Sequence, residues 1–235
     1  MKRHVLIWSM VLLFGFVSAL GLCVQALYAP QAVAAIDDMH KVIAVDAGHG
    51  GIDGGVRGIT SKKKESEINL EIAKALQAQL EESGFEVVLT RSTDNGLYDF
   101  TTKGFKKRDM QKRKEILQRA EPALVISLHQ NFYPTKSTRG AQVFYSVKKE
   151  EDKDFALILQ EKLNRLYGAE GVKERNCMKG DFFILDCCAV PSVLIECGFL
   201  SSEKDEKLLL DKGWQKRIAQ SITSGVLAYF SQSSC

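Results

Sequence analysis

The chain has 235 residues, of which 45% are hydrophobic and 26% charged, enough to build the core of one ordinary globular domain. Its formal net charge is +3, from 32 Lys and Arg residues against 29 Asp and Glu residues. Because Lys2 and Arg3 account for two of these charges and residues 1–34 contain no acid, the rest of the chain is almost neutral. This balance gives no electrostatic case for nucleic acid binding.

The N-terminal segment has the pattern of an export signal. Lys2-Arg3-His4 is a basic stretch, and residues 5–24 are apolar apart from two serines, which is long enough to cross a bilayer. Ala32-Val33-Ala34 has the A-x-A form of a cleavage site. We therefore expect residues 1–34 to be a signal peptide or an N-terminal membrane anchor, and residues 35–40 to be a connector. The body is expected to be exported and to meet the membrane only through this segment.

A strand followed by a glycine-rich turn opens the body. Residues 41–46 are mostly β-branched and apolar, which predicts a buried strand, and Gly48-His49-Gly50-Gly51 follows it. This turn nearly matches the dinucleotide fingerprint G-x-G-x-x-G, but Asp53 replaces the third glycine and no helix begins there. A histidine at the carboxyl edge of a sheet is placed to act as a metal ligand or a catalytic base. The alternative is a structural turn with an incidental histidine.

Helices and strands alternate through the rest of the chain. Apolar residues at helical spacing (Ile68, Ile72, Ala75, Leu76 and Leu80) predict a helix from Glu65 to about Gly84. The later predicted elements are strands at 85–90, 123–129, 140–146 and 191–196, helices at 106–119, 152–166, 202–210 and 214–230, and a short extended run at 183–185. The alternation predicts an α/β fold: a single domain with a mostly parallel, twisted sheet and helices on both faces.

Three of the predicted buried strands end in residues that can do chemistry, namely His49, His129 and Glu196. The chain has four histidines, and the two others, His4 and His40, lie in or beside the leader. Both histidines of the body therefore follow hydrophobic strands. Two imidazoles and one carboxylate would make a catalytic zinc site with one open position.

The third zinc ligand should be a carboxylate near the turn that carries the first histidine. Glu65 begins the first predicted helix and lies three residues before Ile68, so the two share the helix face that points to the core. Glu67 is the alternative, but its position on the helix predicts greater exposure. The sequence therefore favours Glu65.

Four sequence blocks resemble those of the zinc-dependent N-acetylmuramoyl-L-alanine amidases. They are Val45–Gly51, Glu65–Leu70, Ser127–Asn131 and Val193–Ser201. They occur in the same order as in that family, and the similarity spans nearly the whole body. The small size and the stretch Lys179-Gly180-Asp181-Phe182-Phe183 are most similar to the germination-specific branch, which acts on spore cortex peptidoglycan.

The resemblance implies that residues 41–233 form a zinc amidase catalytic domain. It implies that Zn²⁺ is held by His49, Glu65 and His129, with Glu196 as the catalytic carboxylate. The implied reaction is hydrolysis of the amide bond between N-acetylmuramic acid and L-alanine in peptidoglycan. In the spore cortex this would be a step towards muramic lactam formation and germination.

Three other functions are alternatives to amidase activity. Another exported zinc amidohydrolase or peptidase acting on peptidoglycan stays open, although the chain lacks the H-E-x-x-H motif of many zinc proteases. A serine hydrolase is disfavoured because no G-x-S-x-G occurs, and a Cys197 nucleophile would leave Glu196 without a role. The non-enzyme alternative is a wall-binding protein whose zinc site is vestigial or is switched by a protein partner.

The remaining arginines and cysteines of interest are expected to be structural. Arg91 and Arg113 lie where the family often has arginines, and we expect ion pairs with Asp94 or Glu115 rather than substrate contacts. The six cysteines include an adjacent pair and no C-x-x-C motif, so neither a regular set of disulfides nor a cysteine zinc site is expected.

Overall fold

The computed structural model describes residues 41–98 and 103–233. The predicted leader and connector, residues 1–40, therefore lie outside the described residues. Within the two described ranges, no helix combines the length and the apolar character needed to cross a membrane.

A six-stranded sheet forms the centre of the domain, with its strands in the order β2-β1-β3-β6-β4-β5. The strands are β1 (Val42–Ala47), β2 (Glu86–Leu89), β3 (Leu124–Asn131), β4 (Gln142–Ser146), β5 (Met178–Gly180) and β6 (Ser192–Phe199). The four strands β2, β1, β3 and β6 are parallel to one another. The strand β4 runs antiparallel to β6 and parallel to β5. The expected α/β fold with a mostly parallel sheet is confirmed.

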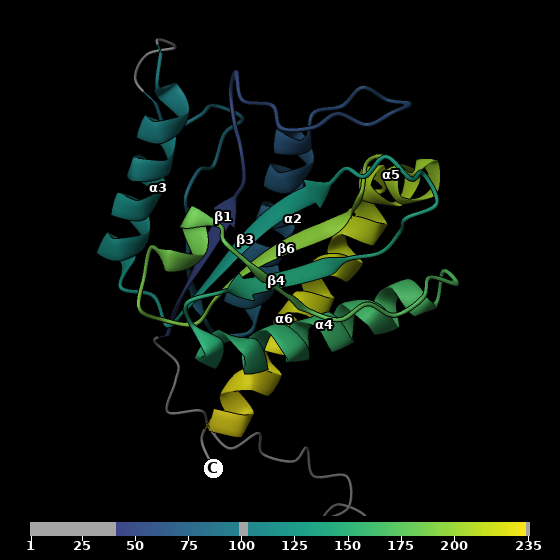
Figure 1. The fold of residues 1–235 in the computed structure, drawn as a ribbon. Coiled ribbons are helices and arrows are strands. Elements are labelled where there is room, and N and C mark those ends of the chain that lie inside the picture. The colour runs from purple at the N-terminus through teal and green to yellow at the C-terminus, as the bar shows by residue number, and fades with distance from the viewer. Residues whose placement is uncertain (1–40, 99–102, 234–235) are drawn as a thin grey trace, which may run out of the picture. The chain divides into compact units, whose positions relative to one another are not determined.

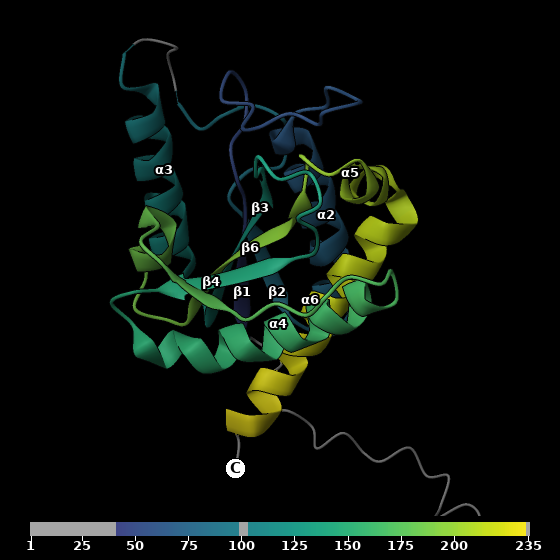
Figure 2. The ribbon, with the colours of Figure 1, turned by 45° about the vertical axis from the view of Figure 1, so that its right-hand side comes forward.

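Helices cover both faces of this sheet (Figures 1 and 2). One face carries α2 (Glu65–Glu82), α4 (Lys153–Gly168) and α6 (Lys212–Ser233), and the other carries α3 (Phe105–Ala120) and the short 3₁₀ helix η2 (Phe183–Asp186). The smaller elements are η1 (Glu150–Asp152), just before α4, and α5 (Glu203–Leu210), just after β6.

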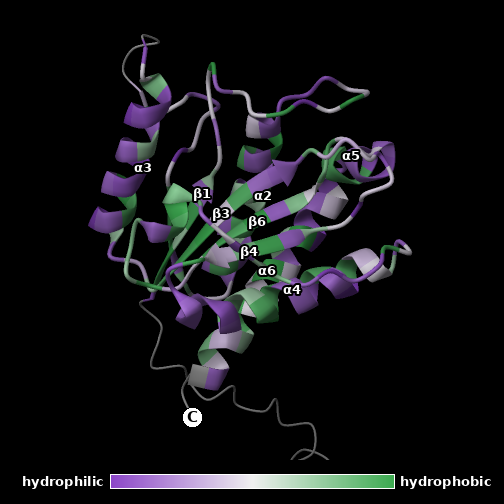
Figure 3. Ribbon diagram, viewed as in Figure 1, coloured by the Kyte–Doolittle hydropathy of each residue, from purple (hydrophilic) through white to green (hydrophobic). Residues whose placement is uncertain are grey.

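The two cores follow from the alternation of side chains along each strand. On β1, Ile43 and Val45 belong to the larger core under α2, α4 and α6, whereas Ala44 belongs to the smaller core under α3 and η2. Figure 3 shows that the central strands are largely hydrophobic, whereas much of α3 is hydrophilic. Leu117 is the main apolar residue that α3 buries.

Two predicted segments differ from the structure. Residues 183–185, expected to be extended, lie in the helix η2, where Ile184 and Leu185 turn into the smaller core. The strand β6 does not end at Glu196 but continues to Phe199, because it stays paired with β3 as far as Asn131. Glu196 therefore lies within the strand, directly beside His129 of β3.

Candidate metal centre

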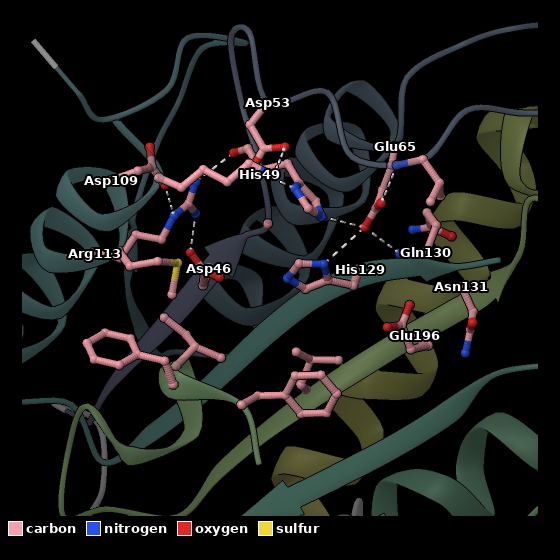
Figure 4. A pocket seen from close by; sticks show the side chains of 18 of the residues that line it. Asp46, His49, Asp53, Glu65, Asp109, Arg113, His129, Gln130, Asn131 and Glu196 are labelled. Atoms are coloured by element: carbon pink, nitrogen blue, oxygen red, sulfur yellow. Dashed lines mark hydrogen bonds and ion pairs between the residues drawn. The ribbon is translucent and has the colours of Figure 1, made fainter. Parts of the chain in front are cut away.

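His49 lies in the turn after β1 and has an unusual backbone conformation. Its φ angle is 61°, in the left-handed region that non-glycine residues seldom occupy. Its Nδ1 atom lies 3.2 Å from the Asp53 carboxylate, and its Nε2 atom lies 3.3 Å from Oε1 of Glu65. Asp53 therefore fixes the orientation of the ring, so that Nε2 points towards Glu65 (Figure 4).

Two buried arginines hold this turn through its backbone carbonyl groups. Arg113 donates to the carbonyl of His49 at 2.6 Å and to that of Ala47 at 2.8 Å. Arg91 donates to Ala47 at 2.8 Å and to Gly48 at 3.0 Å. The carbonyls of three successive residues are thus satisfied by guanidinium groups, which offsets the cost of the left-handed backbone at His49.

The ion-pair partners of Arg113 differ from those expected. Arg113 pairs with Asp46 on β1 and with Asp109 one helical turn earlier at 2.7 Å, whereas Glu115 pairs with Lys112. Burial alone would raise the pKa of Asp46, but Arg113 and two hydroxyl groups outweigh this and lower it to about 2. Asp46 is therefore a carboxylate at neutral pH, buried against a guanidinium.

Arg91 likewise differs from its expected pairing with Asp94. Its guanidinium donates hydrogen bonds to backbone carbonyl groups, among them those of Thr93 and Ser66, each at 2.8 Å. Because these carbonyls belong to its own loop and to the first turn of α2, Arg91 ties the loop and the helix to the histidine turn. Arg91 thus contacts backbone carbonyl groups in place of the expected carboxylate.

Glu65 is the first residue of α2, and only 2% of its surface is exposed. Its Oε1 atom lies 3.0 Å from Nδ1 of His129 and accepts the backbone N–H of Gln130 at 3.0 Å, while Oε2 accepts the N–H of Val56 at 2.9 Å. Burial alone would raise the pKa of Glu65, but hydrogen bonds to the two histidines hold it well below its ordinary value. Glu67 is partly exposed, as its helical position predicts.

The second histidine, His129, lies near the carboxyl end of β3. The ring centroids of His49 and His129 are 4.9 Å apart, and the planes of the two rings are inclined by 76°. His129 packs so closely on Gly48 that a methyl group there would overlap its ring. One ligand atom each from His49, Glu65 and His129 lies within 4.8 Å of the others. This set of two nitrogens and one carboxylate oxygen fits a zinc ion.

Glu196 lies beside this cluster, on the neighbouring strand β6. The residue as a whole is half-buried, but its Oε2 atom is enclosed and has no hydrogen-bond partner among the described residues. Burial raises the pKa of Glu196 to about 7. An enclosed carboxylate without a partner indicates that something absent from the protein chain belongs beside it.

These residues line one cleft of about 510 Å³ at the carboxyl edge of the parallel strands, which we call the metal cleft. Figure 4 shows His49, Glu65 and His129 pointing towards one another, with Glu196 nearby. The structure thus brings together all four residues that the sequence singled out. Sequence reasoning missed Asp53, Asp46 and the role of Arg113. Of these three residues, only Asp53 could have been recognised from the local sequence, because it lies four residues after His49 in the same glycine-rich segment.

The fold and the cleft define a class of protein, an α/β domain with a candidate metal centre at the carboxyl edge of its parallel strands. The N-acetylmuramoyl-L-alanine amidase family matches residues 43–228. The germination-specific N-acetylmuramoyl-L-alanine amidase of Bacillus subtilis is 34% identical over 195 residues, which cover 82% of this chain and 81% of that protein.

Solved structures agree with these matches. The CwlD amidase from Clostridioides difficile, in complex with the GerS lipoprotein, has a TM-score of 0.77 and 38% identity, covering 81% of this chain and 98% of that one. The catalytic domain of CwlV, an N-acetylmuramoyl-L-alanine amidase from Bacillus (Paenibacillus) polymyxa, has a TM-score of 0.70 and 30% identity, with the same coverage. The chain belongs to the N-acetylmuramoyl-L-alanine amidase family. The expected family, fold and enzyme class are therefore confirmed.

Proposed function

We propose that this protein hydrolyses the amide bond between the lactyl group of N-acetylmuramic acid and L-alanine in peptidoglycan, using a zinc ion held by His49, Glu65 and His129. The observation that carries the proposal is the convergence of three ligand atoms within 4.8 Å of one another, beside a carboxylate that has no partner of its own. Membership of the amidase family supplies the bond that is cut.

The roles of the residues follow from their surroundings. A bound zinc ion would supply Lewis acidity for the scissile carbonyl group and activate water. Glu196 takes the proton of the attacking water and passes it to the leaving amine of L-alanine. Burial of this carboxyl group favours its protonated form and raises its pKa, which helps it to retain the proton between the two transfers. Glu65 stays anionic, and Asp53 keeps the His49 ring turned towards the site.

We further propose that the substrate is the peptidoglycan of the spore cortex. It is supported by the germination-specific name of the B. subtilis relative and by the sequence likeness over 82% of this chain. Cortex peptidoglycan lies outside the cytoplasmic membrane, so residues 1–34 would export the enzyme as a cleaved signal or an anchor. N-terminal sequencing of the protein recovered from its natural host distinguishes the two, since cleavage leaves a new N-terminus after Ala34.

An activating protein partner is also part of the proposal. The support is a solved amidase that shares 38% sequence identity with this chain and whose structure is described as a complex with the GerS lipoprotein. If a partner completes the site, the isolated protein binds zinc more weakly than the complex. Equal zinc affinity of the isolated chain and of the chain in host extract would argue against such a partner.

The most direct test combines metal analysis with digestion of defined muropeptides. We expect about one zinc ion per chain and release of peptides with free L-alanine amino ends. Chelation should abolish this release, and added zinc should restore it. Free glucosamine amines would instead indicate a deacetylase, and cuts within the stem peptide would indicate a peptidase. Full activity after complete zinc removal would contradict the proposed mechanism.

A further inference from the structure

Three exposed phenylalanines stand at the metal cleft. Phe132, Phe182 and Phe183 have 46%, 36% and 49% of their surfaces exposed, and all three line the cleft. Every other phenylalanine in the described ranges is buried or half-buried. Large apolar side chains grouped at a concave site mark a surface that binds a ligand.

Phe182 and Phe183, which we call the aromatic ledge, lie where the helix η2 begins. The ring of Phe182 meets that of Phe144 edge-on at 5.3 Å and lies over Gly180, where a methyl group would overlap it. The next two residues of η2 are buried in the smaller core. The ledge is therefore an apolar surface formed before any ligand arrives, which lowers the entropy cost of binding.

The ledge lies on the same face of the sheet as Glu196. Phe144 of β4, which supports the ledge, is paired with Leu194 of β6. Leu194 also lines the cleft, and it precedes Glu196 by two residues, a distance of about 7 Å along a strand. A group resting on the ledge would thus lie in the same cleft as the bond that Glu196 is proposed to help break.

The groups on the two sides of the scissile amide differ in chemistry, and only the group on the acyl side can make apolar contact with the ledge. On the acyl side is a pyranose ring, whose C–H face and acetyl methyl group can stack on a phenyl ring. On the amine side is a stem peptide that carries carboxylates. Charged groups elsewhere in the cleft, where Lys106 pairs with Asp53 at 3.3 Å, suit that peptide better.

We propose that the aromatic ledge of Phe182 and Phe183 binds the sugar ring of the N-acetylmuramoyl group, and so makes the enzyme prefer amides attached to a glycan. This inference rests on the proposed function, because it assumes which bond is cut.

The test compares two substrates that differ only in the sugar. One is an N-acetylmuramoyl tripeptide, and the other is the same tripeptide carrying a D-lactyl group alone. The primary variant is Phe183→Ala, because Phe183 is the more exposed of the two rings, and Phe183→Tyr keeps an aromatic face. Leu157→Ala is the matched control, since Leu157 is 46% exposed on α4 and does not line the cleft.

We expect the wild type to cut the sugar-bearing substrate with the higher kcat/KM. Phe183→Ala should lower that value about tenfold, a loss typical of an aromatic contact, and should leave the lactyl substrate unchanged. Phe183→Tyr should retain the preference, and Leu157→Ala should match the wild type.

Two results would overturn the inference alone: equal losses on both substrates, or no preference for the sugar in the wild type. A wild-type protein that cuts neither substrate would instead contradict the proposed function, and the inference with it. Thermal unfolding of each variant should match the wild type, because both substituted side chains are at the surface.

Discussion

At the scale of single residues, close packing and hydrogen bonds fix the positions of the proposed metal ligands. His129 packs against Gly48, which has no side chain, and His49 is held in a left-handed conformation by hydrogen bonds to its own carbonyl and those before it. Glu65 accepts hydrogen bonds from backbone groups on two sides. Ligands held in this way bind metal with little reorganisation.

Gly48→Ala tests this close packing. The added methyl group should displace the His129 ring and weaken zinc binding about 10- to 100-fold, as measured by titration against a competing chelator. Gly168→Ala is the matched control, because a methyl group there would have no atom within 4 Å. Equal zinc affinity of Gly48→Ala and the wild type would contradict the packing described here.

Asp46 gives the protein a predictable response to acid. Its pKa falls from 3.8 to about 2 on folding, so it contributes stability that is present above pH ~4 and is lost as the pH falls through ~2. The shift is worth roughly 2 kcal/mol.

The stability difference between wild type and Asp46→Asn should therefore shrink between about pH 5 and about pH 2. Urea unfolding of the metal-free proteins measures it. Asp154→Asn, at an exposed acid on α4, is the control for the loss of one surface carboxylate. A deficit of Asp46→Asn that stays constant with pH would refute this assignment.

At the scale of elements, α3 serves the site through a charge as well as through apolar packing. Its fully buried residues are Leu117, which packs in the smaller core, and Arg113, which reaches across to Asp46 and to the carbonyl of His49. The helix thus supports the turn that carries the first histidine.

Arg113→Met should cost about 3–5 kcal/mol of unfolding free energy, because it leaves the Asp46 carboxylate buried without its partner. Adding Asp46→Asn should recover part of this loss, since the unpaired charge is then gone. Arg119→Met, at an exposed position of the same helix, should change stability by less than about 0.5 kcal/mol. If the two methionine variants unfold alike in urea, the buried pair does not stabilise the fold.

Sequence reasoning recovered most elements because their patterns are local. The stripe from Ile68 to Leu80 identified α2, and its phase separated Glu65 from Glu67. Prediction from the sequence failed where contacts between residues distant in the chain determine the local structure or the ion pair. Arg113 pairs with a carboxylate 67 residues away, which no local spacing reveals. In η2, three apolar residues carry too little periodicity to separate a strand from a helix, and burial of Ile184 and Leu185 decides it.

At the scale of the whole molecule, parallel strand order creates the site. Because β1, β3 and β6 run in the same direction, their carboxyl ends meet at one edge. The turn after β1, the start of α2 and the end of β3 each supply one proposed ligand. A bound ion would therefore join segments that are up to 80 positions apart, from His49 to His129.

Zinc should accordingly stabilise the folded protein by mass action. At a free concentration 100 times its dissociation constant, the gain is about 2.7 kcal/mol, visible as a rise in thermal midpoint with added zinc. His129→Ala should remove this dependence. A thermal midpoint that ignores zinc in the wild type would show that no such site forms.

In the proposed mechanism, three residues hold the metal while Glu196 transfers the proton. The measurement that tests it most directly is zinc content and muropeptide turnover in Glu196→Gln beside the wild type. We expect the same zinc content in both proteins and a turnover of Glu196→Gln that is lower by at least about 100-fold. Retained turnover, or loss of the zinc, would contradict it.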